Sequence, residues 1–472
     1  MDIKSQDFMA LAQKAIGDPD LQAAVTHATN TAYAKRLAAM FAVGREHGEA
    51  MRQQAAEAKR RALRRLPDLL EQAEANMTVN GIQVMWARDA DEVNHLVLQI
   101  ARRHQVRLAV KTKSMSSEEV GVNHVLEPSG IEVVVTDLGE FIVQLGGESP
   151  SHIVTPVIHK TKAAIRDLFV RQLGMPPTDD AAEMTRFARQ HLRRLFLAAD
   201  MGISGGNFVI AETGTLCLVT NEGNGRLVTT LPRVHVALVG IEKIVETVDD
   251  YATLTQVLPR SATGQTMAVY THLIHGPRRD DEIGGPEHVY VIWVDNGRSR
   301  MYASAYHEAL NCIRCGACLN ACPVYQATGG HAYGWVYPGP IGAVITPLYV
   351  GLERATPLPH ASSLCGRCQE VCPVIIDLPH LLLALRQDLV RQGKSPKTWD
   401  LGLRIWAMVA RSPRLLALAG AAARLGGGWV ASARLPGPLG GWTRYRDFPP
   451  FAPQSFHQLW RKRQKAEPYD QS

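Results

Sequence analysis

Hydrophobic and polar positions change their spacing along the first 140 residues of the chain. Residues 21–77 are rich in Ala, Leu, Arg, Glu and Gln, which favour helices. Short apolar runs then predict three strands, at residues 82–87, 107–112 and 131–135. Amphipathic segments between them predict two helices, at residues 91–103 and 116–127. Strand–helix–strand repetition predicts an α/β fold with a Rossmann-like, doubly wound parallel sheet.

Later segments add further predicted elements. Residues 152–159 (HIVTPVIH) predict a strand with a His at each end, and apolar strands are predicted on both sides of Thr213. An Asn-Gly turn is expected at Asn224. Pro379 opens an apolar helical run, which predicts the start of a helix there.

These patterns divide the 472 residues into four regions. They are an N-terminal helical region (1–77), an α/β domain (78–300), a cysteine-rich domain (301–395) and a helical, basic C-terminal region (396–472). The first twenty residues contain no apolar signal segment, and charges interrupt every long apolar stretch. The sequence therefore predicts a cytoplasmic protein.

Positive charge is concentrated in the C-terminal region. Residues 401–472 contain eleven Lys or Arg and three acidic residues, a net charge of +8 in a chain whose total is +6. Such a tail suits an acidic partner or the inner face of an anionic membrane, and a solvated tail is the equally simple alternative. The basic run from Lys59 to Arg65 is interpreted as a solvated helix face, and no nucleic-acid partner is expected.

Seven of the eight cysteines lie between residues 312 and 372. Clustered thiols in a reducing compartment indicate metal ligands rather than disulfides. The first group follows the spacing C-x2-C-x2-C-x3-C-P that is typical of [4Fe–4S] ligation, with ligands at Cys312, Cys315, Cys318 and Cys322. Zinc, which usually takes two paired C-x2-C knuckles, is the weaker alternative.

The second group repeats this motif with Ser362 where its first cysteine would stand. The fourth thiolate of such a motif binds the other cluster. Cluster 1 is therefore predicted on Cys312, Cys315, Cys318 and Cys372, and cluster 2 on Cys322, Cys365 and Cys368. Cluster 2 therefore lacks one cysteine ligand. Either it is a [3Fe–4S] cluster with a vacant corner, or the fourth ligand is an oxygen of Ser362 or Ser363, His360, solvent, or a partner or substrate. Residues 323–361 between the motifs are either a segment that wraps a cluster or an ordinary surface loop.

Two further places in the α/β domain are candidates for ligand binding. Lys111, Lys113 and Ser114 follow a predicted strand, and Ser116 with Glu119 fits a capping box, which together suggest an anion site at a helix start. Glu212 lies where an apolar strand ends, as a candidate nucleophile or base, although a paired structural carboxylate is the simpler interpretation. Motifs for dinucleotides, P-loop nucleotides, serine hydrolases and zinc peptidases are absent from the sequence.

Together these segments resemble the lactate utilization protein B family over roughly residues 30–470. The resemblance is carried by KTKSMSSEEVGVNHVLE (111–127), TDLGEFIVQL (136–145), PSHIVTPVIHKT (150–161) and GGNFVIAETGTLCLVTNEGNGR (205–226), followed by the cysteine motifs. It implies a LUD-type body similar to the NagB/RpiA/CoA-transferase fold, with iron–sulfur ligands on the same seven cysteines. It also implies two companions, a cysteine-rich iron–sulfur protein and a second LUD-domain protein, with which the chain oxidises L-lactate to pyruvate.

We therefore expect an electron-transfer subunit with two iron–sulfur clusters, both [4Fe–4S] or the second [3Fe–4S]. One alternative is the iron–sulfur subunit of another 2-hydroxy-acid or glycerol-phosphate dehydrogenase. A second is a scaffold protein that binds a metabolite at Lys111 and Lys113, and a third is an acyl or CoA transferase that uses Glu212.

Overall fold

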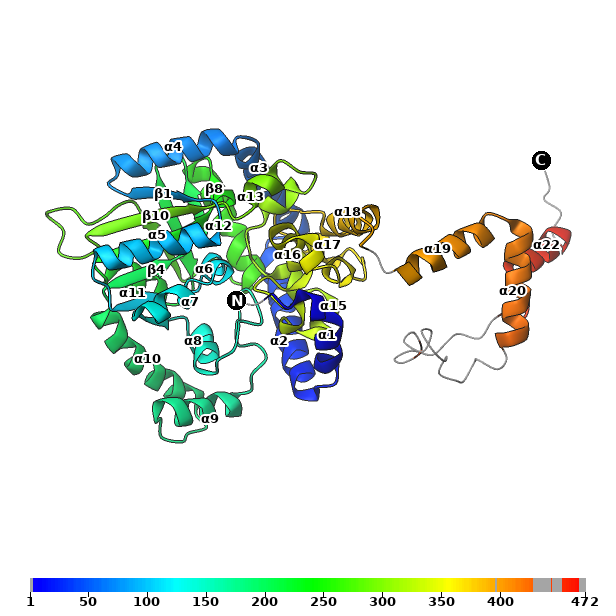
Figure 1. The fold of residues 1–472 in the computed structure, drawn as a ribbon, viewed down its shortest axis with the longest axis horizontal. Helices are drawn as coiled ribbons and strands as arrows, with labels where there is room; N and C mark the ends of the chain where they lie inside the picture. Colours follow the sequence, from blue (N-terminus) through cyan, green and yellow to red (C-terminus); the bar gives the residue numbers. More distant parts are fainter. Residues whose placement is uncertain (1–2, 395–396, 428–442, 444–451, 467–472) are drawn as a thin grey trace. The chain divides into compact units, whose positions relative to one another are not determined.

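The structure, a computed structural model, describes residues 3–394, 397–427, 443 and 452–466 (Figure 1). The chain forms two compact units, Met1–Gln392 and Gly393–Ser472, which are described separately. The boundary between them lies three residues before the division predicted at residue 395.

The first unit begins with four helices, α1 (Phe8–Ile16), α2 (Pro19–Met40), α3 (Arg45–Arg64) and α4 (Leu66–Val79). Asp18 caps α2 by accepting a hydrogen bond from the Leu21 N–H (3.0 Å), and Pro19 supplies a residue that suits the first helical position. These helices confirm the helical prediction for residues 21–77.

The body is a six-stranded parallel sheet with the order β1-β10-β7-β4-β2-β3. Its strands are β1 (Gln83–Ala87), β2 (Leu108–Lys111), β3 (Glu132–Val135), β4 (Met201–Ser204), β7 (Val234–Gly240) and β10 (His288–Val294). Alternate residues of β10 enter different cores. Val291 and Trp293 join the core shared with the N-terminal helices, whereas Tyr290 and Ile292 pack with helix α5 (Ala90–Arg103). Burial on both faces is what a parallel, doubly wound sheet requires, so the predicted fold class is confirmed.

A second, four-stranded sheet has the order β8-β5-β6-β9 and was not predicted as a unit. Its strands are β5 (Phe208–Ile210), β6 (Thr215–Thr220), β8 (Ile244–Val245) and β9 (Tyr270–Ile274). Helix α12 (Val248–Ala262) packs against α2 and α3, and the sheet joins the same core. The remaining helices of the body are α6 (Met115–Val120), α7 (Asn123–Leu126), α8 (Leu138–Leu145), α9 (Lys162–Leu173), α10 (Ala181–Ala198) and α11 (Asn224–Thr230).

Three local predictions are wrong. Residues 151–161 form turns rather than a strand, because the His152 ring accepts the N–H groups of Val154 (2.9 Å) and Thr155 (3.1 Å). Asn224 begins helix α11 instead of an Asn-Gly hairpin turn. The predicted helix 116–127 is broken after α6, where Gly121 adopts a left-handed conformation (φ +68°).

The cysteines belong to a region of short helices that we call the cysteine module (residues 307–391). It contains α14 (Ala317–Asn320), α15 (Pro323–Thr328), α16 (Gly339–Val350), α17 (Arg367–Glu370) and α18 (Leu378–Arg391), and α13 (Arg298–Tyr302) precedes it. Short 3₁₀ helices complete the first unit: η1 (Ser5–Asp7), η2 (Glu127–Ser129), η3 (Ile241–Lys243), η4 (His307–Asn311), η5 (His331–Tyr333), η6 (Leu352–Arg354) and η7 (Leu358–His360). Pro379 stands in the first turn of α18, as predicted.

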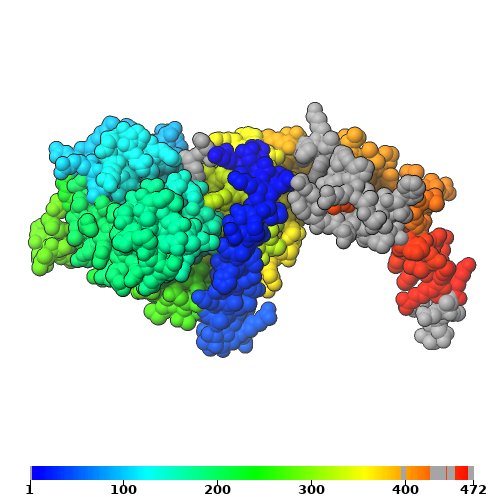
Figure 2. All heavy atoms as spheres, turned by 90° about the horizontal axis from the view of Figure 1, so that it is seen from below, coloured from blue at the N-terminus to red at the C-terminus, as the bar shows by residue number. Residues whose placement is uncertain are grey.

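The N-terminal helices pack on the cysteine module rather than forming a separate body. Helices α1 and α2 both contact α15, and α2 also contacts α14. Figure 2 shows the N-terminal segment in blue against the yellow residues of the module. Segments about 300 residues apart in sequence therefore build one core.

The second unit contains α19 (Lys397–Ala410), α20 (Pro413–Gly427) and α22 (Phe456–Ala466), and α19 packs against α20. Four of its basic residues lie on α22, at Arg461, Lys462, Arg463 and Lys465. Four more, Arg404, Arg411, Arg414 and Arg424, lie in or next to α19 and α20, and the basic residues at 434, 444 and 446 lie outside the described residues. Within the described ranges, helices of the length and apolarity needed to span a membrane are lacking.

Candidate iron–sulfur centre

The two cysteine motifs have the same backbone conformation. In the first motif, Arg314 (φ +59°) and Gly316 (φ +74°) flank Cys315 in the left-handed region. In the second motif, Leu364 (φ +54°) and Gly366 (φ +83°) flank Cys365 in the same way. Each glycine is followed by a four-residue helix, α14 or α17, that carries the next cysteine. Left-handed conformations at two bulky residues are uncommon, and their repetition shows that the two loops share the same local shape.

Four thiols gather around a small cavity, which is lined by Cys312, Cys315, Cys318 and Cys372. Burial raises the pKa of Cys315 to about 12, and the neighbouring Cys372 and Cys312 act in the same direction. Burial also raises the pKa of Cys372 to about 11, although the Ile376 N–H, which donates to its sulfur at 3.4 Å, opposes this. These are the four residues predicted for cluster 1, and three come from the first motif and one from the second.

The other three thiols form a second group. Burial raises the pKa of Cys368 to about 12, and the nearby Cys322 and Cys365 act in the same direction. Cys322 is likewise influenced by Cys365, across 43 positions of sequence. Cys365 differs from the other motif cysteines because it is exposed, and hydrogen bonding from the Arg367 N–H lowers the pKa of its thiol. The second group therefore reaches the surface of the unit, whereas the first is mostly buried.

The surroundings of the thiols fit an iron–sulfur cluster. Tyr333 is fully buried, and its hydroxyl has no hydrogen-bond partner within the described residues. Burial raises the pKa of its phenol, and the nearby Cys322, Cys318 and Cys368 act in the same direction. A buried O–H without an acceptor is costly, and sulfur atoms of a bound cluster would supply that acceptor. Within the described ranges, no three Cys, His, Asp or Glu side chains lie close enough together to bind a single metal ion. A cubane does not require such proximity, because its four thiolates bind at separate corners.

The segment between the motifs wraps this region. Tyr325, Tyr333 and Tyr337 are buried, and Trp335 packs edge-on against Tyr337 with ring centroids 5.5 Å apart. Residues 323–361 are thus part of the packed surroundings of the cysteines rather than an ordinary surface loop. The segment limits water near the thiols, which is one of the factors that set the potential of a cluster.

Two buried arginines of the N-terminal helices hold the second motif. Arg36 donates to the Val371 carbonyl at 2.7 Å, and Arg52 donates twice to the Cys372 carbonyl at 2.9 and 3.1 Å. The guanidinium groups therefore place positive charge beside the Cys372 end of the second motif. Sequence patterns gave no indication of this role, because these arginines lie more than 300 positions from their partners.

A buried network of charges reaches the first motif through Arg314. Arg298 of α13 donates to both carboxylate oxygens of Glu119 at 2.8 Å and to Glu242 at 2.6 Å. Arg314, from the first motif, lies 3.5 Å from Glu242 and stacks on the Tyr337 ring at 4.9 Å. The network ties the six-stranded sheet to the loop that carries Cys312.

Two predictions for this region are wrong. Lys59 was assigned to a solvated helix face, but it is buried and donates to the carbonyls of Glu242 (2.6 Å) and Ile244 (3.2 Å). Burial, together with Lys243, lowers the pKa of Lys59 to about 7. The predicted capping box also differs, since Ser114 rather than Ser116 caps α6 and Glu119 binds Arg298 instead.

The candidate anion site has partners within the chain. The buried Lys111 forms an ion pair with Glu118, and Lys113 donates to the Val154 carbonyl at 2.6 Å. Ser114 accepts the Ser117 N–H at 3.3 Å. Glu212 lies in a different place, at the turn after β5, where its exposed carboxylate accepts the Val248 N–H at the start of α12 (3.1 Å). The structure thus does not bring Glu212 together with the lysines.

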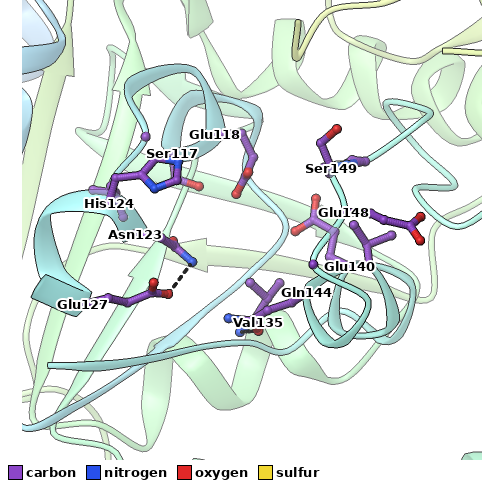
Figure 3. Close-up of a pocket in the computed structure, with 15 residues that line it drawn as sticks. Ser117, Glu118, Asn123, His124, Glu127, Val135, Glu140, Gln144, Glu148 and Ser149 are labelled. Atoms are coloured by element: carbon purple, nitrogen blue, oxygen red, sulfur yellow. Dashed lines mark hydrogen bonds between the residues drawn. The ribbon is translucent and has the colours of Figure 1, made fainter. Parts of the chain in front are cut away.

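A cavity of about 280 Å³ is lined by Glu118, the ion-pair partner of Lys111, and by Val135 at the end of β3 (Figure 3). Its labelled carboxylates are Glu118, Glu127, Glu140 and Glu148. Glu140 is only 4% exposed, and neither of its carboxylate oxygens has a hydrogen-bond partner within the described residues. Burial and the neighbouring Glu118 raise the pKa of Glu140 to about 8. Sequence reasoning missed this residue, because nothing near it in the chain distinguishes it from a surface glutamate of an amphipathic helix.

Glu140→Gln is expected to flatten the pH dependence of stability. Because the pKa of Glu140 is raised to about 8 in the folded protein, its contribution is complete below the unfolded pKa and is lost as pH rises toward 8. The wild type should therefore lose about 3 kcal/mol relative to the variant between pH 5.5 and pH 8. Urea unfolding at both pH values measures the difference. Equal pH slopes in the two proteins would contradict the assignment.

Comparison with known protein families agrees with this architecture. Residues 70–294 match the LUD domain, residues 308–376 match a 4Fe-4S dicluster domain, and residues 387–465 match the C-terminal region of lactate utilisation protein B. The dicluster match supports iron–sulfur clusters in the cysteine module.

Relatives match over nearly the whole chain. Lactate utilization protein B of Bacillus cytotoxicus is 41% identical, with 98% of this chain and 99% of that protein covered. The protein of the same name from Bacillus pumilus and the uncharacterized electron transport protein YkgF of Escherichia coli are each 40% identical, with 99% of both chains covered. The chain belongs to the lactate utilization protein B family.

Proposed function

We propose that this protein is the iron–sulfur subunit of a complex that oxidises L-lactate to pyruvate, and that it carries electrons through two clusters. The observation that carries the proposal is the pair of matching loops, which present seven thiols in two groups beside a buried tyrosine hydroxyl without an acceptor. The names of the relatives supply the substrate.

Cluster 1 is assigned to Cys312, Cys315, Cys318 and Cys372, and cluster 2 to Cys322, Cys365 and Cys368, each as [4Fe–4S]. When bound, the clusters supply one-electron transfer. The residues of the chain determine the surroundings. Backbone N–H groups donate to Cys312 (3.4 Å) and Cys372 (3.4 Å), and hydrogen bonds of this kind stabilise negative charge on sulfur.

The two groups differ in their access to solvent, which suggests a direction for electron flow. Cluster 1 would lie in the interior, beside Arg314 and the network of Arg298, whereas cluster 2 would reach the surface at Cys365. We place exchange with a partner at the Cys365 side. The partners we propose are a cysteine-rich iron–sulfur protein and a second LUD-domain protein.

The test is reduction of the clusters by substrate in the anaerobically purified complex. We expect about eight irons per chain of this protein. L-Lactate should produce the electron paramagnetic resonance (EPR) signals of reduced clusters, whereas glycolate and glycerol 3-phosphate should not. If the clusters are present but only glycolate or only glycerol 3-phosphate reduces them, that compound and not L-lactate is the substrate of the complex. If the purified protein contains zinc or no metal, the proposal that it transfers electrons is wrong.

A further inference from the structure

We infer that the side-chain oxygen of Ser362 is the fourth protein ligand of cluster 2, at the corner that corresponds to Cys312 of cluster 1. The inference rests on the proposed function, because it requires the two clusters. It goes further by selecting one occupant for a corner that the cysteine spacing leaves open.

The side chains of Ser362 and Cys312 make the same contact. The Arg314 N–H donates to Cys312 Sγ at 3.4 Å, and the Leu364 N–H donates to Ser362 Oγ at 3.1 Å. In both loops the donor lies two residues after the acceptor and has a left-handed φ, +59° for Arg314 and +54° for Leu364. The serine oxygen therefore occupies the place in its loop that the cysteine sulfur occupies in the other.

The rest of the second motif continues the match. Cys365 follows Leu364 as Cys315 follows Arg314, and a left-handed glycine then starts the short helix in each loop. Because these local features repeat from Ser362 to Cys368, we infer that Ser362 Oγ takes the corner of cluster 2 that Cys312 Sγ takes in cluster 1. Cys322 supplies the remaining thiolate from the first motif.

The loop is held where a ligand is needed. Arg386 of α18 donates to the carbonyls of Pro359 and Ser362, both at 2.8 Å, and so fixes the backbone on the N-terminal side of the motif. The neighbouring Ser363 is exposed, and its side chain hydrogen-bonds to the Cys365 thiol. Ser363 is thus a partner of a ligand, whereas Ser362 stands in the ligand position.

Binding of Ser362 is a ligation step without electron transfer. The Ser362 O–H bond breaks, its proton leaves to water, and an O–Fe bond forms at the fourth iron. Ser362 is half-buried, so that water can accept the proton. An alkoxide is a harder donor than a thiolate, so cluster 2 should have spectra and a potential distinct from those of cluster 1.

Three variants of the full-length protein test the inference: Ser362→Ala, Ser362→Cys and the neighbouring control Ser363→Ala. Iron and sulfide content and EPR spectra of oxidised and reduced protein are the readouts. Ser362→Ala should lose about one iron of about eight and show, when oxidised, the signal of a three-iron cluster. Ser362→Cys should keep all irons and change the reduced signal and potential of cluster 2 only. Ser363→Ala should keep the wild-type iron content and show no three-iron signal, because it removes only a hydrogen bond to the Cys365 thiol and no ligand.

Several results would overturn the inference. A wild-type protein with about seven irons and a three-iron signal would show a vacant corner. Wild-type spectra in both Ser362 variants would show that solvent, His360 or a partner supplies the ligand. Ser362→Cys keeps the test decisive if the alanine variant does not fold, because a new thiolate at a ligating position must alter the spectrum of cluster 2. The cluster 1 signal should persist in every variant, and its absence from the wild type would instead reject the proposed function.

Discussion

Arg298→Met is expected to destabilise the first unit by about 3–5 kcal/mol. Arg298 is 1% exposed, and its guanidinium binds Glu119 with two hydrogen bonds of 2.8 Å and Glu242 with one of 2.6 Å. Methionine fills a similar volume but leaves two buried carboxylates without their main cation. The cost of a buried, uncompensated charge is larger than the gain from the pair itself, so that removal of one partner has a large effect.

The pH dependence of this effect has a definite sign. Burial tends to raise the pKa of Glu242, but Arg298, Lys243 and Arg314 outweigh burial and lower it to about 2. A depressed pKa contributes stability above the unfolded value and loses it as pH falls toward the folded one. Without Arg298 the Glu242 carboxyl can take up a proton instead, so the destabilisation by Arg298→Met should be smaller at pH 5.5 than at pH 8.

Urea unfolding under anaerobic conditions, followed by fluorescence, measures both effects. Arg300→Met is the matched control, because Arg300 lies on the same helix but is exposed. We expect the control to change the free energy of unfolding by less than about 0.5 kcal/mol. If the two variants unfold at the same urea concentration, the network does not stabilise the fold as argued.

The same network shows where sequence reasoning ends. Periodicity located β1, β2 and β3 within a residue or two, since each is a short apolar run between amphipathic helices. Glu119, Glu242 and Arg298 come from three distant elements, and no local pattern links a carboxylate on α6 with an arginine on α13. The partners of these charges are determined by the tertiary fold alone.

The four-stranded sheet was missed for a related reason. β5 has three residues and β8 has two, so neither is long enough for a period to be recognised. β8 pairs with β5 across more than 30 positions, and β9 pairs with β6 across 50 or more. In contrast, the spacing of the cysteines is enough to predict a grouping, because ligand spacing is set by the geometry of a cluster rather than by the surrounding fold. The structure brings Cys312, Cys315, Cys318 and Cys372 to one cavity, and their binding of a cluster stays a prediction.

That grouping leads to the prediction with the largest effect, which is that the ligands cross between the motifs. Cys372→Ala should remove cluster 1, although Cys372 lies in the second motif. Cys322→Ala should remove cluster 2, although Cys322 lies in the first. Each variant should lose about four of about eight irons. The reason is position: Cys372 lines the cavity of Cys312, Cys315 and Cys318, whereas Cys322 lies with Cys365 and Cys368.

Reference variants identify which cluster is lost. Cys315→Ala should lose cluster 1 and Cys368→Ala should lose cluster 2, so the EPR spectrum of Cys372→Ala should match the former and that of Cys322→Ala the latter. Cys217→Ala is the control that should keep all iron, because this buried thiol lies in β6 of the small sheet, outside the cysteine module. If the spectrum of Cys372→Ala instead matches that of Cys368→Ala, and the spectrum of Cys322→Ala matches that of Cys315→Ala, each motif holds its own cluster. Crossed ligation instead locks the two motifs together, so that either cluster can form only when both loops are folded.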